Sequence, residues 1–291
     1  MKIRNSFLVL ITLLSISQSV DAQLLWEISG KNITKKSYLF GTHHLIPISF
    51  LDSVPDLFKS FNTCDVVIGE MAINNIDFTS TISTFGTMPD SIRIAQLIDR
   101  DDYLYVDSVL QETVHIGLRQ MELLNPSLIS AIYQLDLYSK TAGITDELQS
   151  DSYFQVVAAY KGMEVIGLET EDRQIALLIN NEQLQKQAHD LVKVVRNSNR
   201  LIHEFRYMNK LYTSGKIEDL VTYAKSPQTI EMTDSEYAKS VDNRNTAWME
   251  QLPGLIKNQA CFIAVGALHL GGEKGLIRLL KDAGYKVNPV K

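Results

Sequence analysis

Several signatures that mark common enzyme classes are missing from this chain of 291 residues. It has no Gly-x-Ser-x-Gly motif, which argues against a serine hydrolase of the usual α/β type. It also has no Gly-x-Gly-x-x-Gly motif and no P-loop, so a nucleotide cofactor is not expected. The formal charge is −6 and there is no basic stripe, so nucleic acid is not an expected partner.

The chain has only two cysteines, Cys64 and Cys261, and neither belongs to a Cys-x-x-Cys pair. This argues against a thiol-redox enzyme. Each cysteine stands at the start of a predicted strand, so a disulfide is geometrically conceivable if the two strands are neighbours. The alternative, which we favour, is a pair of buried thiols within a sheet.

The N-terminal residues 1–22 resemble a secretory signal peptide. Lys2 and Arg4 precede an apolar stretch at residues 7–16, and Val-Asp-Ala at 20–22 resembles a cleavage site. The apolar stretch is shorter than the ~20 residues of a membrane span, although an uncleaved anchor is the alternative. We therefore expect an exported protein, periplasmic or secreted, with no stable membrane span once the signal is removed.

Short apolar runs alternate with longer helical patterns along the rest of the chain. Strands are predicted at residues 37–41, 65–69, 164–167, 261–265 and 285–287, and helices at 53–61, 171–195, 201–212, 233–252 and 274–283. Thr233 and Glu236 form a capping-box signature at the start of one helix. The pattern predicts one α/β domain over residues 23–291, with a mostly parallel or mixed central sheet flanked by helices.

Four predicted strand ends carry similar polar residues. Two strands run into a Gly-x-x-His motif, which places His44 and His269 just beyond the strands. Two others end in glycine followed by a carboxylate, which places Glu70 and Glu169 at the same end. Ligands bind at the carboxyl ends of strands in open α/β sheets, and glycine permits a sharp turn or a close approach there. We expect these four side chains to share one rim.

Two imidazoles and one or two carboxylates are sufficient to bind a divalent metal ion. His44, His269 and Glu70 are the predicted ligands, with manganese, cobalt or zinc as the ion. Such an ion lowers the pKa of bound water and polarises a carbonyl, while a nearby glutamate acts as general base. The alternatives are that both histidines cap neighbouring backbone groups and that Glu169 caps the following helix.

An arginine and an asparagine lie in the middle of the apolar stripe predicted for the helix at 233–252. Arg244 is therefore expected to be buried, and a buried arginine needs a carboxylate or an anionic ligand. It could orient Glu70 or Glu169, bind substrate, or form a purely structural ion pair.

At these residues the sequence resembles the TraB/GumN family, which includes the Tiki proteins. The matching stretches, in the family's order, are residues 38–45, 65–70, 162–170 and 265–276. The resemblance implies a fold related to the erythromycin esterase-like proteins. In the Tiki branch it implies a membrane-anchored peptidase that depends on manganese or cobalt.

The resemblance places family motif residues at His44, His269, Glu70, Glu169 and Asp151 and at the pair Arg244 and Asn245. With the residues themselves, it leads us to expect Glu70, Glu169 and Arg244 as the catalytic set, His44, His269 and Glu70 as the metal ligands, and Asn245, Asp151 and the neighbouring His43 as the substrate-binding set. The chain departs from the family at His43, where an apolar residue is more usual, and no C-terminal anchor is expected. The first departure puts the ligand geometry in doubt.

The sequence thus predicts a metal-dependent hydrolase, in the first place a peptidase that acts on exported or extracellular peptides. The alternative is a non-catalytic protein on the same fold that binds a peptide, a glycan or a pheromone-like ligand. An esterase that uses histidine and glutamate without a metal follows from the fold analogy alone. Both Gly-x-x-His motifs are intact, which favours the hydrolase, because a degenerate member should have lost at least one.

Overall fold

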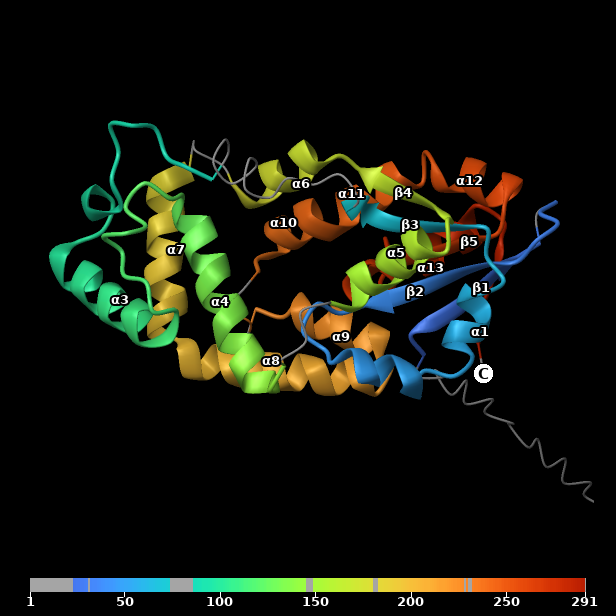
Figure 1. Ribbon diagram of the computed structural model, residues 1–291, viewed down its shortest axis with the longest axis horizontal. Coiled ribbons are helices and arrows are strands. Elements are labelled where there is room, and N and C mark those ends of the chain that lie inside the picture. The colour runs from blue at the N-terminus through green and yellow to red at the C-terminus, as the bar shows by residue number, and fades with distance from the viewer. Residues whose placement is uncertain are drawn as a thin grey trace, which may run out of the picture.

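A six-stranded mixed sheet forms the centre of the protein, and helices flank it (Figure 1). The computed structural model describes residues 23–30, 32–73, 86–144, 149–179, 183–227, 229 and 232–290. The predicted signal peptide lies outside these residues. Within the described ranges, no helix combines the length and the apolar character needed to cross a bilayer.

The strands lie in the spatial order β4-β3-β5-β2-β1-β6. In chain order they are β1 (Leu25–Ser29), β2 (Ser37–Thr42), β3 (Val66–Met71), β4 (Glu164–Glu169), β5 (Cys261–Gly266) and β6 (Lys286–Pro289). Strands β4, β3, β5 and β2 are parallel, whereas β1 runs antiparallel to both of its neighbours. The predicted α/β fold and its five predicted strands are confirmed.

Strand β1 is not predicted from the sequence. It contains Glu27 between apolar residues, so it lacks the continuous apolar run of the parallel strands. Only Leu25 and Ile28 of this strand are fully buried. Antiparallel strands tolerate such a partly exposed face, and the hydrogen bonds to β2 and β6 hold β1 in the sheet.

The two cysteines lie on neighbouring strands, as the disulfide hypothesis requires, since Val66 of β3 pairs with Cys261 of β5. Both thiols are free and buried. Burial is the largest of the causes that raise the pKa of Cys64 and of Cys261 to about 12. Each is therefore a protonated, unreactive thiol within the core.

Aromatic side chains pack helices onto the sheet. The α-helices of the described residues are α1 (Leu57–Phe61), α3 (Arg100–Thr113), α4 (Pro126–Ala142), α5 (Ser150–Tyr160), α6 (Glu171–Leu178), α7 (Leu184–Arg196), α8 (Ser198–Thr213), α9 (Ile217–Ala224), α10 (Asp234–Tyr237), α11 (Asn243–Trp248), α12 (Leu252–Asn258) and α13 (Leu276–Asp282). The ring of Phe154 in α5 lies 4.7 Å from Phe262 of β5 and 5.3 Å from Phe61 of α1. These contacts anchor α1 and α5 on the main core.

Helices α3, α4 and α7 form a second hydrophobic cluster beside the sheet, on the left of Figure 1. Helix α8 extends from this cluster to the main core. Its residues Leu201 and Phe205 belong to the second cluster, and Tyr212 belongs to the core around the sheet. Because α8 contacts both clusters, it fixes the second cluster next to the strand ends.

The helix predicted for residues 233–252 is interrupted. α10 begins at the predicted capping box, where Thr233 N donates to Glu236 Oε2 at 2.9 Å. A π-helical turn at Ala238–Asp242 then separates α10 from α11, and α12 begins only at Leu252. Such wider turns inside a helix occur frequently at functional sites.

The helix predicted at 53–61 begins only at Leu57, after Asp56 with its left-handed φ of 52°.

The capping box makes a prediction about acid stability. Partial burial raises the pKa of Glu236, but hydrogen bonds from Thr233 and Lys186 outweigh it and lower the pKa from 4.5 to about 2. Because the folded pKa lies below the unfolded one, this stabilisation is complete above pH 4.5 and is lost as the pH falls toward 2. We expect urea unfolding to separate the wild type from Glu236→Gln clearly at pH 6 and much less at pH 3. An equal gap at both pH values would contradict this assignment.

Candidate functional site

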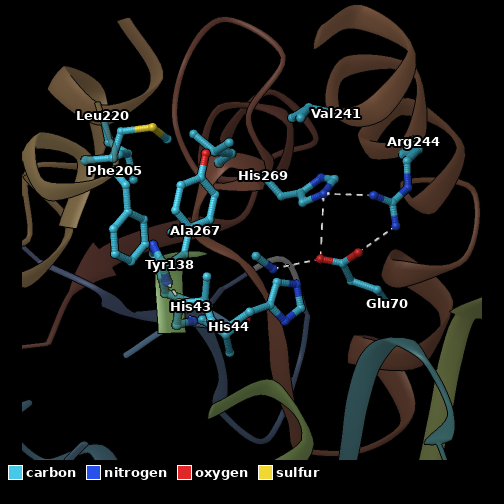
Figure 2. A pocket seen from close by; sticks show the side chains of 15 residues that line it. His43, His44, Glu70, Tyr138, Phe205, Leu220, Val241, Arg244, Ala267 and His269 are labelled. Carbon is cyan, nitrogen blue, oxygen red and sulfur yellow. Dashed lines mark hydrogen bonds and ion pairs between the residues drawn. The ribbon is translucent and has the colours of Figure 1, made fainter. Parts of the chain in front are cut away.

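The carboxyl ends of four parallel strands bring polar side chains to one rim of the sheet. Glu70 lies in β3, Glu169 ends β4, His44 follows β2, and His269 follows β5. Arg244 from α11 contacts three of these residues, namely Glu70 and His269, which Figure 2 shows, and Glu169. The rim that the sequence predicts is therefore present, with Arg244 at its centre.

The glycines at the strand ends do not make sharp turns, which is one of the two roles that the sequence predicts for them. Gly167 and Gly266 both have negative φ and lie within strands. A Cβ on Gly167 would lie 2.6 Å from the backbone nitrogen of Ala72, and one on Gly266 would lie 3.1 Å from Glu70 Oε1. The glycines thus permit close approach by other parts of this protein.

The guanidinium group of Arg244 holds two carboxylates, and its Nη2 lies within 3.0 Å of an oxygen of each. Its Nη2 donates to Glu70 Oε2 at 2.6 Å, and its Nε donates to both oxygens of Glu169 at 3.1 and 3.0 Å. Its Nη1 donates to the Ser240 carbonyl at 3.0 Å and to His269 Nε2 at 3.2 Å. Only 10 % of the Arg244 side chain is exposed. Both carboxylate partners proposed for a buried Arg244 are thus present.

Glu70 is ionised at neutral pH. Burial alone raises the pKa of Glu70, but the charges of His269 and Arg244 and the hydrogen bonds from Gly266 N and Arg244 lower it to about 2. The His269 ring is neutral at pH 7, because burial lowers its pKa to about 4. The guanidinium group and the Gly266 amide, which donates at 2.8 Å, are therefore what keeps Glu70 charged there.

His269 is held in one tautomer by Asn245. The amide nitrogen of Asn245 donates to the carbonyls of His269 at 3.1 Å and Lys274 at 2.8 Å, so its Oδ1 faces His269 Nδ1 at 2.7 Å. Nδ1 must therefore carry the proton, and Nε2 presents a lone pair to Arg244. Arg244 adds to the effect of burial on the pKa of His269, whereas Glu70 opposes it.

His44 lies on the other side of Glu70 from His269 (Figure 2). Its Nδ1 is 3.2 Å from Asp151 Oδ2 and 3.2 Å from Gln149 Oε1. Burial lowers the pKa of His44, but the hydrogen bond and charge of Asp151, aided by Glu70 and Gln149, raise it to about 9. The ring is thus charged at neutral pH even though 62 % of the side chain is exposed.

Trp248 belongs to this site, although the sequence places it only on an apolar stripe. Its Nε1 donates to Glu169 Oε1 at 3.0 Å, and its ring lies 4.4 Å from the His269 ring. Together with Arg244 it encloses Glu169, whose side chain is fully buried. The available signal is its position four residues after Arg244, on the same helix face. Glu169 does not cap α6, because the cap of that helix, Thr170, has no side-chain cap hydrogen bond.

His43 points away from this network. Its Nδ1 accepts from Leu45 N at 3.0 Å, and its backbone is fixed on both sides by the Ser150 hydroxyl, at 3.1 and 2.8 Å. Burial first, and then the charge of His44, lower the pKa of His43 to about 4 against the opposing effect of Asp151. His43 is therefore a neutral imidazole in a fixed orientation.

A cavity of about 310 Å³ opens beside the strand ends. Five of the predicted site residues line it: His43, His44, Glu70, Arg244 and His269. The other three predicted residues do not line the cavity but contact residues that do. Glu169 contacts Arg244, Asn245 contacts His269, and Asp151 contacts His44. Their observed contacts are thus with residues of the site.

The three predicted metal ligands fit a divalent ion in chemical type. Each of His44 and His269 uses Nδ1 for a protein partner, which is the usual arrangement of metal-bound histidines, and Glu70 is an anionic oxygen donor. In the described part of the chain, however, no three His, Cys, Asp or Glu side chains are arranged to hold a metal ion. Arg244 contacts both His269 Nε2 and Glu70, so a bound ion would require Arg244 to shift.

Comparison with known proteins agrees with the motif pattern. The model of the TraB/PrgY/gumN family matches residues 24–289, a range that includes both Gly-x-x-His motifs and Arg244. Comparisons with curated proteins and with solved structures give no match. Since the family model covers almost the whole chain, the protein belongs to the TraB/PrgY/gumN family.

Proposed function

We propose that this protein is a metal-dependent hydrolase, with peptides as the first substrates to examine. The observation that carries the proposal is the way the two motif histidines are held. Asp151 and Asn245 each engage one Nδ1, so each ring turns its Nε2 away from that partner, and both rings lie beside the ionised Glu70 (Figure 2). Histidines in metal sites are oriented by partners of this kind.

His44, His269 and Glu70 would hold the ion, which would supply a water molecule of lowered pKa and polarise the substrate carbonyl. The remaining site residues orient these three ligands or set their charge. Asn245 fixes the tautomer of His269, and Asp151 fixes the ring of His44. Arg244 and Glu169 are positioning residues, because Glu169 holds the guanidinium group that keeps Glu70 ionised.

A second candidate is a binding protein on the same fold that uses no metal. One observation favours it, because protein groups already satisfy two of the three predicted ligands, Glu70 and His269. Glu70 accepts from Arg244 and Gly266, and His269 Nε2 accepts from Arg244. Such a protein would bind a peptide, a glycan or another small molecule, and a non-hydrolytic site would tolerate the loss of either histidine.

We expect the purified protein to bind about one manganese, cobalt or zinc ion per chain, and the double variant His44→Ala/His269→Ala to bind none. Elemental analysis after dialysis, followed by calorimetric titration with each ion, measures this directly. His203→Ala is the matched control, because His203 is an exposed histidine on α8 away from the cavity.

The competing outcomes separate the two candidates. Stoichiometric metal in the wild type and in His203→Ala, but not in a folded double variant, supports the hydrolase and justifies a screen with peptide substrates. If none of the three proteins binds any of the ions, the metal-dependent hydrolase is wrong and the binding protein is favoured. Circular dichroism spectra of all three proteins show whether they are folded.

A further inference from the structure

The cavity has two chemically different ends. Its polar end is formed by the histidines, Glu70 and Arg244 described above. Its other end is walled by apolar and aromatic side chains, namely Leu45, Tyr138, Phe205, Met208, Leu220 and Val241. In Figure 2 the rings of Tyr138 and Phe205 lie on one side of the cavity, and Glu70 and Arg244 lie on the other. A ligand that fills the cavity therefore needs both a polar and an apolar part.

The apolar wall is rigid before any ligand binds. The rings of Tyr138 and Phe205 stack with centroids 4.6 Å apart and planes 11° apart, and both residues belong to the second hydrophobic cluster. Val241 comes from the π-helical turn, and Leu220 from α9. Because the wall combines buried side chains from several packed helices, it is already shaped for a bulky group.

His43 adds one hydrogen-bond donor to this end of the cavity. Its Nδ1 accepts from Leu45 N, so in the neutral ring the proton is on Nε2. Among the described residues no partner for Nε2 is present, and the atom is not enclosed by protein. The ring packs 5.0 Å from Tyr212, and His43 lines the cavity. Its Nε2–H group is thus a fixed donor available to a ligand.

The size and charge of this end restrict what it accepts. The whole cavity, polar end included, measures about 310 Å³, at the small end of the ~300–1,000 Å³ range of ligand sites, so its apolar end has room for a single bulky group rather than an extended chain. The six wall residues carry no charge. A charged group placed there would lose its hydration without gaining a partner, so it is excluded.

We propose that the apolar end is a specificity subsite for one large apolar side chain, aromatic or branched aliphatic, and that His43 Nε2–H donates to the carbonyl oxygen of the same residue. This proposal rests on the proposed function in one respect, because it takes the polar end of the cavity as the place where the bond next to this residue is cleaved. The binding step itself requires no metal. The substrate class is thus a peptide or acyl compound with a bulky apolar residue at the scissile bond.

The proposal is tested with N-acetyl amino-acid amides of phenylalanine, leucine, glycine and glutamate, titrated against the full protein in the presence of EDTA. We expect the phenylalanine and leucine amides to bind at least ~10-fold more tightly than the other two, because only they bury an apolar side chain. Ligand-observed NMR at millimolar concentration is suited to such weak binding.

Two variants locate the binding. Met208→Trp fills the cavity and should weaken the phenylalanine amide about 10-fold or more, whereas the matched control Lys210→Trp, an exposed position on α8, should not change it. His43→Leu keeps the bulk of the side chain but removes the donor, and should weaken both apolar amides about 5- to 10-fold.

Equal binding of all four amides, or binding that Met208→Trp leaves unchanged, would overturn the proposal. Failure of the hydrolase looks different. In that case no metal binds, but the phenylalanine amide still binds selectively in EDTA and still responds to Met208→Trp. That pattern supports the subsite as part of a binding protein.

Discussion

Replacing Arg244 by alanine is expected to lower the free energy of unfolding by about 3–5 kcal/mol. The guanidinium group forms the hydrogen bonds that neutralise Glu70 and Glu169, whose side chains are 24 % and 0 % exposed. Alanine leaves Glu70 without its cation and leaves Glu169 with only the half-exposed Arg173, whose Nε lies 3.7 Å from Glu169 Oε1. Removing one partner of a buried ion pair is costly for this reason, even where the intact pair contributes little.

Urea unfolding at pH 7 measures the effect of Arg244→Ala, and Arg278→Ala is the matched control. Arg278 also pairs with a carboxylate, Asp282 at 2.9 Å, but the two side chains are 66 % and 57 % exposed. An exposed pair of this kind contributes little to stability, because solvent screens its charges. Similar small losses for both variants would show that Glu70 and Glu169 do not depend on Arg244, which would remove the basis for its positioning role.

The conservative variant Arg244→Lys is expected to recover little of this loss. Nη2 of Arg244 lies within 3.0 Å of both carboxylates, but Nε also donates to Glu169, and Nη1 donates to the Ser240 carbonyl and to His269. The single ammonium group of lysine cannot replace this whole set of donors. Combining Arg244→Ala with Glu169→Gln should cost clearly less than the sum of the two single changes, because the second change removes one of the unpaired charges. Additive losses would mean that the two residues do not act as one unit.

The arrangement of these charges explains why the site resembles a metal centre without being arranged as one. Arg244 contacts both Glu70 and His269, whose Oε1 and Nε2 atoms are 3.7 Å apart, so its guanidinium group provides there the positive charge that a bound ion would provide. Its partner Glu169 is enclosed by Trp248 and is out of contact with the cavity. A cation entering this end must compete with Arg244, which is why metal affinity is the informative first measurement.

Much of this site follows from local sequence patterns. The apolar runs before Glu70 and Glu169 predict parallel strands, and parallel strands place their carboxyl ends on one edge of the sheet. The apolar stripe through Tyr237, Val241 and Trp248 predicts that Arg244 is buried, and all four of these side chains are buried. A buried cation then requires buried anions nearby, which the strand ends supply.

The parts that the sequence does not predict depend on contacts between distant segments. Ser150 fixes the backbone of His43 across 107 positions, and Trp248 reaches Glu169 across 79. No periodicity within one segment reports on such a contact. Strand β1 is missed for a related reason, because Glu27 breaks the apolar run and the strand depends on its pairing with β2 and β6 and on the burial of Leu25 and Ile28.

The glycines at the strand ends show how backbone packing positions the site. Replacing Gly167 by alanine is expected to lower the free energy of unfolding by about 2–3 kcal/mol. The new Cβ would lie 2.6 Å from the backbone nitrogen of Ala72 and 3.1 Å from backbone atoms of Met71 and Glu169, so no flexible side chain can move aside. β4 would have to shift against β3, and the shift would carry Glu169 away from Arg244.

Gly254→Ala, the same substitution in α12, is expected to have the opposite sign. A Cβ on Gly254 would contact no atom within 4 Å, so alanine only improves the helix propensity there, by about 0.5–1 kcal/mol. Urea unfolding midpoints of the two variants should therefore lie on opposite sides of the wild type. If Gly167→Ala were neutral, the close approach of β3 and β4 would not require glycine. The position of Glu169 behind Arg244 would then have to depend on its side-chain partners Arg244, Trp248 and Arg173, because the backbone would no longer constrain it.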